Sequence, residues 1–521
     1  MKTAFAVGEH RFSVGDIVAV GRAGALARLS RRPLVRRRIQ SARDWLVAAV
    51  NRGEVLYGVN TGVGTNAVFL LPPDQAERFQ ETNLEQLCCG TGAPLHPEIV
   101  RAAMLLRAVT LALGYSAVRV ELIEQLLRLL NAGITPVVPR HGSVGASGDL
   151  IPSGYVGRVL LGKGRVQYRG RVQTARRALA AAGIAPIRLS YKEGLALING
   201  TTFMTGAAAL VVADAEAALR GFLAAAALAV EALGASPEPY EEFVQKVKGH
   251  LGQKAVGSHL RGLLAGSGAV GSTAELRRRA RAEKSAGRAA VNIQSGYSVR
   301  CIPQGIGPMY ETLAAARAVV ETEANSANDN PLIDAARGRV YHAGNFYGGH
   351  IARAMDGLKL DLATLANWSN ALMAVLVDDR FSNGLPPALA ARPGLDTGWK
   401  GMQLSMTSLA CAVRQLASPS MLHPVPTEQH NQDMVSLGVH AALTARDALD
   451  CARDAVSILL LAACQAVDLR GCAGRLGAST GKVYRGLRAL SRFADADRPL
   501  DDDIARVAQA VRDGELALLD W

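Results

Sequence analysis

The chain has 521 residues, of which 49% are apolar, 20% charged and 5% aromatic. This balance excludes a disordered, collagen-like or low-complexity protein, and the length allows a large buried core. Lysine and arginine (58) outnumber aspartate and glutamate (45), so the formal net charge is +13, which would permit binding to nucleic acid, acidic membranes or anionic substrates. Because alanine and leucine dominate the apolar residues, we expect a mainly α fold.

The two most basic segments, 31–38 and 275–284, are interpreted as solvent-exposed helices. Neither has aromatic residues among its charges on which bases could stack, and glutamates interrupt the second. The N-terminal sequence MKTAFAVGEHRF lacks a sustained apolar stretch, and apolar runs such as 457–467 are too short to cross a bilayer. We therefore expect a cytoplasmic protein that binds neither nucleic acid nor membranes.

Three parts of the chain are distinguished by composition. Residues 1–190 are rich in turns with short helical segments, residues 191–475 contain long alanine- and leucine-rich helices, and residues 476–521 form a C-terminal helical part. The segment 204–233 is apolar around most of its circumference, which is typical of a helix buried in a large bundle or oligomer. The seven cysteines show none of the spacings of zinc sites, so we expect neither a metal site nor a disulfide framework.

The segment HGSVGASGDLIPSGY (141–155) carries the most informative pattern. Gly148 has no Cβ, so its amide nitrogen can approach the carbonyl carbon of Ala146 closely, and loss of water across Ser147 would leave an exocyclic methylene. Such a group is an electrophile made from the chain itself, which no ordinary side chain supplies. The simpler interpretation is a helix start capped by Ser147 or Asp149, with Pro152 in the first turn.

The wider context favours the electrophile. Six further motifs stand in one order and approximate spacing, namely YGVNTGVG (57–64), GLALINGTTFMTG (194–206), QSGYSVRCIPQ (294–304), EANSANDNP (323–331), GNFYGGH (344–350) and EQHNQDMVSLG (428–438). Together with Ala146-Ser147-Gly148-Asp149, they resemble the aromatic amino acid ammonia-lyases and related aminomutases that carry a 4-methylidene-imidazol-5-one (MIO) group. The resemblance covers about residues 50 to 470. It implies a long central helical bundle of the aspartase/fumarase-like type with a smaller N-terminal domain that bears the MIO group.

The resemblance also implies the catalytic groups. Ala146, Ser147 and Gly148 would cyclise autocatalytically to the MIO group, so no external cofactor is needed. Tyr57 matches the tyrosine on a mobile loop that is the candidate base for the β-proton. Because a free tyrosine has a pKa of about 10, we expect nearby positive charge to favour its phenolate. Arg300 matches the clamp for the substrate carboxylate, to which a planar guanidinium is suited.

The remaining site residues follow from the same motifs. Tyr297 and Gln294 match a second tyrosine and an amide, which would share one turn with the carboxylate clamp. Asn199 corresponds to the residue that hydrogen-bonds the MIO carbonyl oxygen. Asn330 and Phe346 correspond to support at the carboxylate end and to a pocket wall.

Three positions bear on which amino acid is the substrate. An ungapped alignment places Gln86 and Leu87 at the family's selectivity pair, which is commonly Phe-Leu in phenylalanine lyases, His-Leu in tyrosine lyases and Ser-His in histidine lyases. Leu87 argues against histidine, and so does Gln432, because histidine lyases resemble one another in having glutamate there. An amide at position 86 could hydrogen-bond a phenolic hydroxyl. We therefore expect an ammonia-lyase that favours tyrosine over phenylalanine and releases the trans-arylacrylate.

Two alternatives stay open. A 2,3-aminomutase would share every motif, although Thr61-Gly62 is typical of lyases where several mutases resemble each other in a Ser-Met pair; a histidine lyase is the other enzymatic alternative. A non-enzymatic helical scaffold or nucleic-acid binder would need a degraded triad, which the sequence does not have. The resemblance further implies a homotetramer in which each active site is built from three subunits.

Overall fold

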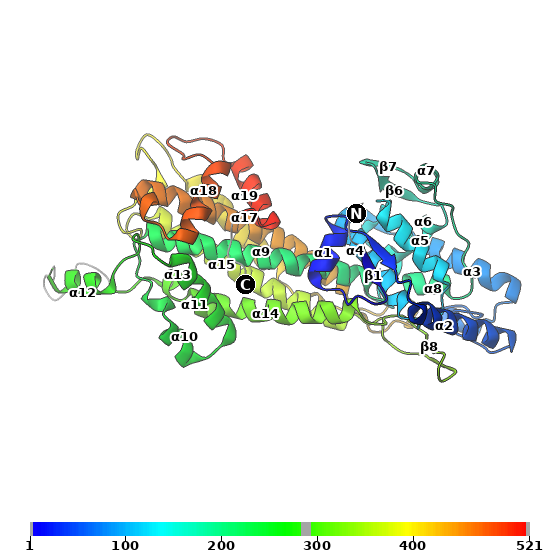
Figure 1. Ribbon diagram of the computed structural model, residues 1–521. Helices are drawn as coiled ribbons and strands as arrows, with labels where there is room; N and C mark the ends of the chain where they lie inside the picture. The colour runs from blue at the N-terminus through cyan, green and yellow to red at the C-terminus, as the bar shows by residue number, and fades with distance from the viewer. Residues whose placement is uncertain (1–3, 283–292, 517–521) are drawn as a thin grey trace. The chain divides into compact units, whose positions relative to one another are not determined.

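The computed structural model describes residues 4–282 and 293–516 (Figure 1). By packing, the chain divides into two units. Unit 1 comprises Met1–Ala213, Ala316–Asp356 and Pro419–Leu443, and unit 2 comprises Asp214–Ala315, Gly357–Ser418 and Thr444–Trp521. These units are discontinuous in sequence, whereas the predicted parts 1–190, 191–475 and 476–521 follow chain order, so the two divisions differ. The reason is that long helices contribute residues to both units.

Unit 1 consists of short helices and strands. Its elements are β1 (Phe5–Val7), α1 (Val14–Gly21), β2 (Ala27–Leu29), α2 (Pro33–Asn51), η1 (Gly64–Val68), α3 (Pro73–Gln86), β3 (Thr91–Pro94), α4 (Pro97–Ala112), α5 (Val120–Asn131), β4 (Thr135–Pro136), β5 (Pro139–His141), α6 (Leu150–Leu160), β6 (Arg165–Tyr168), β7 (Arg171–Thr174), α7 (Ala175–Ala181), α8 (Glu193–Ile198), β8 (Leu332–Asp334), β9 (Arg339–Tyr341) and η4 (Ser420–Leu422). Strands β1 and β2 pair in parallel, and the β3–β5, β4–β6–β7 and β8–β9 pairings are antiparallel. Helices α2, α3 and α4 each begin at a proline, whose fixed φ suits the first helical position.

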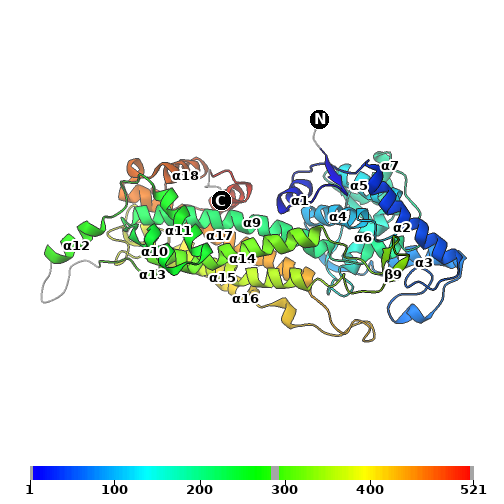
Figure 2. The same cartoon turned by 60° about the horizontal axis from the view of Figure 1, so that its bottom comes forward.

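Unit 2 is a helical bundle. Four long helices supply residues to it: α9 (Thr202–Ala232), α14 (Ile302–Ala324), α15 (Gly349–Val377) and α17 (Gly438–Arg470). Around them lie η2 (Glu238–Tyr240), α10 (Glu242–Lys248), α11 (Leu251–Leu264), α12 (Thr273–Ala282), α13 (Tyr297–Arg300), η3 (Pro387–Leu389), α16 (Lys400–Leu416), η5 (Ala473–Arg475), α18 (Ala478–Leu490) and α19 (Asp501–Asp513). Within unit 2 the long helices run side by side (Figures 1 and 2).

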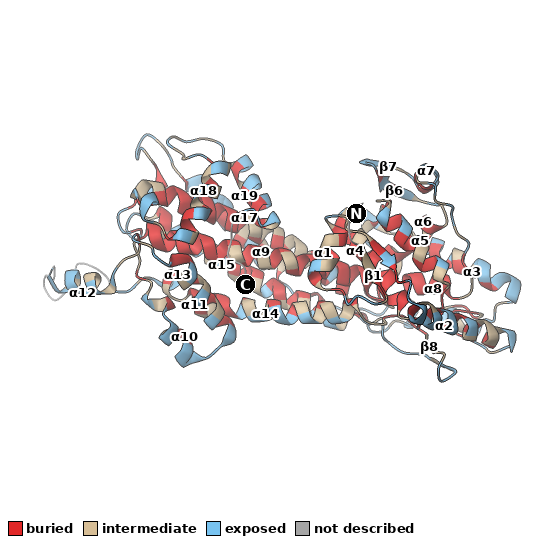
Figure 3. Ribbon diagram, in the orientation of Figure 1, coloured by how far each residue is buried: buried red, intermediate tan, exposed pale blue. Residues whose placement is uncertain are grey.

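Burial agrees with the helix patterns of the sequence. Helix α9 is buried along nearly its whole length, as its apolar circumference predicts (Figure 3). Helix α12 has no buried residue, which confirms the solvent-exposed interpretation of the basic segment as far as Ala282; residues 283 and 284 lie outside the described part. The mainly α fold is confirmed.

One helix among the described residues, α15, is long and apolar enough to cross a membrane by length and composition. Its most apolar window has a mean hydropathy of 1.3, and 44% of that window is buried in the protein. Core helices of globular proteins have the same properties, so this helix is weak evidence for a membrane span.

Candidate active site

Ala146, Ser147 and Gly148 form a tight turn between β5 and α6 in unit 1. Ser147 has a φ of +49° and Gly148 a φ of +81°, both in the left-handed region. A serine in this region costs about 1–3 kcal/mol and persists only where its surroundings enforce it. Glycine is needed at position 148 because a Cβ there would overlap the carbonyl oxygen of Gly200. The three residues on which the predicted cyclisation depends thus lie in a strained, closely packed turn.

Two neighbouring segments hold this turn. On one side the amide of Gly200 donates to the carbonyl of Ser147 at 3.2 Å, and the amide of Asp149 donates to the carbonyl of Gly200 at 2.8 Å. On the other side the amide of Leu437 donates to the carbonyl of Val144 at 3.0 Å. The turn is therefore fixed between the start of α9 and the loop that precedes α17.

Asp149 caps a different helix from the one that the simpler interpretation of the sequence assigned to it. It stands at the N-cap position of α6, but its side chain makes no capping bond there. Its Oδ2 instead accepts hydrogen bonds from the amides of Phe203 (2.7 Å) and Met204 (3.0 Å), in the first turn of α9. The carboxyl is completely buried, and burial raises its pKa from 3.8 to about 7, against the opposing effect of these amides and of Arg107.

This raised pKa predicts a pH dependence of stability. Between pH 4 and pH 7, approximately, the folded protein retains a proton on Asp149 that the unfolded chain has released, so stability falls as pH rises through this range, by up to about 1.4 kcal/mol per pH unit. Asp149→Asn keeps an acceptor oxygen for α9 and removes the titration. We expect urea unfolding midpoints to fall more steeply with pH in the wild type than in Asp149→Asn. Parallel pH profiles for the two proteins would contradict this assignment.

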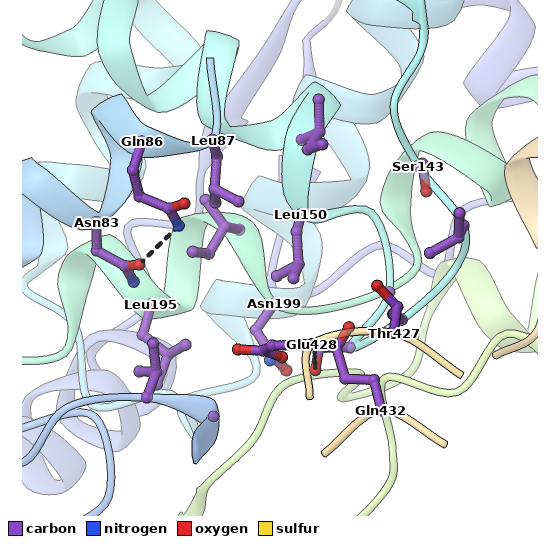
Figure 4. A pocket seen from close by; sticks show the side chains of 18 of the residues that line it. Asn83, Gln86, Leu87, Ser143, Leu150, Leu195, Asn199, Thr427, Glu428 and Gln432 are labelled. Carbon is purple, nitrogen blue, oxygen red and sulfur yellow. Dashed lines mark hydrogen bonds between the residues drawn. The ribbon is translucent and has the colours of Figure 1, made fainter. Parts of the chain in front are cut away.

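A cavity of about 330 Å³ opens beside the turn, within unit 1 (Figure 4). Eight of the residues predicted for the site line it: Tyr57, Gln86, Leu87, Ala146, Ser147, Gly148, Asn199 and Gln432. Its apolar lining includes Leu150, Ile151, Leu195 and Ile198. A mostly apolar cavity with a few convergent polar groups has the character of a small-molecule site.

Tyr57 is half-buried, and its environment differs from the prediction. Its hydroxyl oxygen accepts a hydrogen bond from the amide of Gly64 at 2.9 Å. Burial raises its pKa above the ordinary value of 10.0, the Gly64 amide opposes this shift, and the negative charge of Glu428 adds to it. The groups of the described chain that shift the pKa of Tyr57 include no cation, so the chain itself does not supply the positive charge expected beside it. The net charge of +13 is spread over the whole chain and does not describe this site.

Glu428 is a residue of the site that sequence reasoning missed. It lines the same cavity as Tyr57 and Ser147 and has a left-handed φ of +52°, in a run of such residues that extends to His430. Its place in the motif 428–438 was the available signal, but only Gln432 was singled out there. Chemically, a carboxylate in this position can attract the ammonium group of an amino acid.

A buried arginine, which the sequence motifs did not indicate, holds the backbone at Asn199 in place. Arg107 on α4 donates from Nη1 to the carbonyl of Asn199 at 2.6 Å and to that of Ala196 at 3.2 Å. The side-chain Oδ1 of Asn199 is buried and has no hydrogen-bond partner among the described residues. Across the cavity, Gln432 Nε2 donates to Ser147 Oγ at 3.4 Å. The amide groups thus converge on the strained turn.

Gln294, Tyr297 and Arg300 form a separate cluster in unit 2. Arg300 Nη1 donates to Gln294 Oε1 at 2.8 Å, and its guanidinium lies 4.6 Å from the centre of the Tyr297 ring. Tyr297 is 71% exposed. The structure brings these three together, as predicted, but none of them lines the cavity of unit 1.

Asn330 and Phe346 belong to unit 1 but also lie outside the cavity lining. Asn330 is buried, and its Oδ1 accepts a hydrogen bond from the amide of Ala343 at 2.8 Å. Phe346 is half-buried. In the described chain, Asn330 supports the loop that leads from β9 to α15.

The family follows from a match over most of the chain. The sequence model of the aromatic amino acid lyases matches residues 12–489. The chain belongs to this family. Tyrosine ammonia-lyase of Cupriavidus metallidurans is 39% identical over 516 residues, 97% of this chain and 96% of that protein. Histidine ammonia-lyase of Geobacillus kaustophilus is also 39% identical, over 460 residues and 88% of each chain.

Solved structures agree with the sequence match. The phenylalanine aminomutase of Pantoea agglomerans has a TM-score of 0.94 and 33% identity to this chain, and the match covers 98% of this chain and 99% of that one. The predicted membership of the MIO-dependent aromatic amino acid lyase and aminomutase family is therefore confirmed. Membership of this family shows that the protein is an enzyme. Because a tyrosine lyase and a histidine lyase are equally identical to it, overall identity does not rank the substrates.

Proposed function

We propose that the enzyme eliminates ammonia from an aromatic L-amino acid, with tyrosine favoured over phenylalanine, and releases the trans-arylacrylate. The observation that carries this proposal is the placing of Gln86 and Leu87 in the same cavity as the Ala146-Ser147-Gly148 turn. In the view of Figure 4, Gln86 lies towards one end of the cavity, Gln432 and Thr427 lie towards the other, and Leu87 and Leu150 lie between them. An aromatic ring bound between Leu87 and Leu150 would present its distal edge to the side-chain amide of Gln86.

The strained turn fits the MIO group. Its three residues are small, Gly148 is packed against backbone where no Cβ could be accommodated, and Asn199, whose Oδ1 has no hydrogen-bond partner among the described residues, lines the same cavity. When formed, the MIO group supplies an electrophile that withdraws electrons from the substrate amine. Asn199 would donate a hydrogen bond from Nδ2 to the carbonyl oxygen of the MIO group and stabilise the charge that develops there.

Other side chains of the cavity would bind and deprotonate the substrate. Glu428 would attract the ammonium group, which is released as ammonia. Tyr57 would remove the β-proton as the carbon–nitrogen bond breaks, so its hydroxyl must lose a proton before each turnover. Because its pKa is raised in the single chain, a cation supplied from outside the described cavity would help it to act as a base.

We propose that this cation is Arg300 of another subunit in a homotetramer. Its guanidinium would also clamp the substrate carboxylate through two parallel hydrogen bonds. The proposal is supported by the exposure of Tyr297 beside it and by the absence of Arg300 from the cavity lining of its own chain. Tyr297 and Gln294 would enter the same shared site.

The aminomutase outcome has specific support from the high structural similarity to a phenylalanine aminomutase. The lyase outcome is favoured by the loop after Tyr57. Thr61 Oγ1 accepts from the Gly58 amide at 2.9 Å, and a Cβ at Gly62 would overlap the Asn66 carbonyl oxygen, so a larger residue at position 62 would force this loop to move.

An assay that follows acrylate by its absorbance and β-amino acid by chromatography separates the lyase and aminomutase outcomes. Acrylate without β-amino acid supports the lyase, and β-tyrosine or β-phenylalanine as the main product overturns it.

Gln86→Phe tests the substrate assignment. Replacing the amide with a phenyl ring removes a hydrogen-bonding partner for a phenolic hydroxyl and adds apolar surface near the distal edge of the ring. We expect the ratio of kcat/KM for tyrosine to that for phenylalanine to fall by about tenfold or more. Kinetics with purified variant and wild type measure this ratio. An unchanged ratio would contradict the placing of the ring beside Gln86.

A further inference from the structure

Asn83 lies one helical turn before Gln86 on α3 and lines the same cavity. The spacing of three residues puts both side chains on one face of the helix. Asn83 is only 5% exposed, whereas Gln86 is an exposed residue. Figure 4 shows the two amides side by side at the end of the cavity away from Gln432.

The two amides bond to each other and leave one donor unused. Gln86 Nε2 donates to Asn83 Oδ1 at 3.3 Å. The other polar atom of Asn83, Nδ2, is buried and has no hydrogen-bond partner among the described residues. Because leaving an N–H group buried and unpaired is costly, such groups in folded proteins call for a partner that the chain itself does not supply.

The surroundings define that partner. The cavity that Asn83 and Gln86 line also contains the apolar Leu87 and Leu195, which are drawn next to the amide pair in the view of Figure 4, whereas Glu428 is drawn apart from it. A charged substituent would therefore be poorly stabilised beside Asn83. A neutral group that accepts from Asn83 Nδ2 and donates to Gln86 Oε1 satisfies both amides, and a phenolic hydroxyl has this pair of properties.

We infer that Asn83 is a specificity-determining residue, whose side-chain N–H donates to the hydroxyl oxygen of a 4-hydroxyphenyl substrate, and that Gln86 alone does not account for the preference. This inference rests on the proposed ammonia-lyase function and deepens it. Phenylalanine has no ring acceptor, so in its complex the buried N–H of Asn83 would stay unpaired. This costs more binding free energy than the loss of a hydrogen bond to Gln86, whose amide can bond to water instead.

The test compares wild type with Asn83→Leu, which keeps the branched shape of the side chain and removes the amide, and with Thr82→Val as a matched control. Thr82 is exposed on the neighbouring position of α3, bonds only to backbone of its own helix and does not line the cavity. We expect Asn83→Leu to lower the ratio of kcat/KM for tyrosine to that for phenylalanine by about tenfold or more, with Thr82→Val unchanged. A ratio within twofold of wild type in an active Asn83→Leu enzyme would overturn the inference.

Gln86→Leu keeps the test decisive if Asn83→Leu does not fold. With Gln86 removed, Asn83 still offers its donor, so a preference of tenfold or more for tyrosine over phenylalanine should remain. Loss of the whole preference in Gln86→Leu would assign it to Gln86 and overturn the role of Asn83. Failure of the proposed function looks different, because wild type would then release no acrylate from either amino acid.

Discussion

Ser147→Ala is expected to lower kcat for every aromatic amino acid on the order of 10³-fold or more, as when a member of a catalytic unit is removed. Alanine has no hydroxyl to lose as water, so the chain cannot form an exocyclic methylene at this position. The fold should persist, because alanine and serine have similar difficulty in adopting the φ of +49° found here. Steady-state kinetics under saturating substrate measure the loss.

Ser143→Ala is the control for this variant. Ser143 lines the same cavity and lies on the same loop, where its hydroxyl accepts a hydrogen bond from the Gly145 amide at 3.3 Å. We expect it to retain activity within about tenfold, since it loses one partly buried hydrogen bond of 3.3 Å. Comparable activity in Ser147→Ala and Ser143→Ala would show that the reaction does not need the Ser147 hydroxyl.

Tyr57→Phe is expected to lower kcat by about 10²- to 10⁴-fold, the usual contribution of a positioned general base. The dependence of kcat/KM on pH should also report the role of Tyr57 as a base. Because Tyr57 must be deprotonated to act and its pKa is raised, wild-type kcat/KM should rise with pH while the enzyme remains folded. That rise should disappear in Tyr57→Phe. Glu428→Gln should move it to lower pH, since removing the negative charge lowers the pKa of Tyr57.

Subunit mixing provides the control for Tyr57→Phe and tests the shared site. Tyr57→Phe and Arg300→Ala chains should each have strongly lowered activity alone, and their mixed tetramers should recover part of the wild-type activity if the two residues meet across subunits. Wild-type activity in Tyr57→Phe would remove the base assignment. Demonstrated subunit exchange without recovery would instead contradict the placing of Arg300.

Local features of the fold were predictable because their causes are local. The proline at position 152, which lies in the first turn of α6, and the apolar circumference of α9 act within a few residues, and the structure follows both. The simpler interpretation of the sequence offered Asp149 as a cap of its own helix, and in the structure its carboxylate caps α9 instead. That contact joins residues far apart in the chain, and no local pattern specifies it.

The residues of the site were only partly predictable, because many of its contacts also join residues far apart in the chain. The order of the motifs indicated Tyr57, Asn199 and the triad, which do line one cavity. Asn83 and Glu428 were missed, because their importance depends on which side chains remain unpaired or charged once the cavity has formed. The charge beside Tyr57 could not be derived from the net charge of the chain, because folding places the carboxylate of Glu428 in the same cavity.

The central claim is that Ala146, Ser147 and Gly148 condense into an electrophilic ring without any other enzyme. Intact-mass spectrometry of the purified, active protein measures this most directly. We predict a mass below that of the encoded chain by two water molecules in the wild type, and the full encoded mass in Ser147→Ala. A wild-type enzyme that is fully active at its full encoded mass would contradict the account.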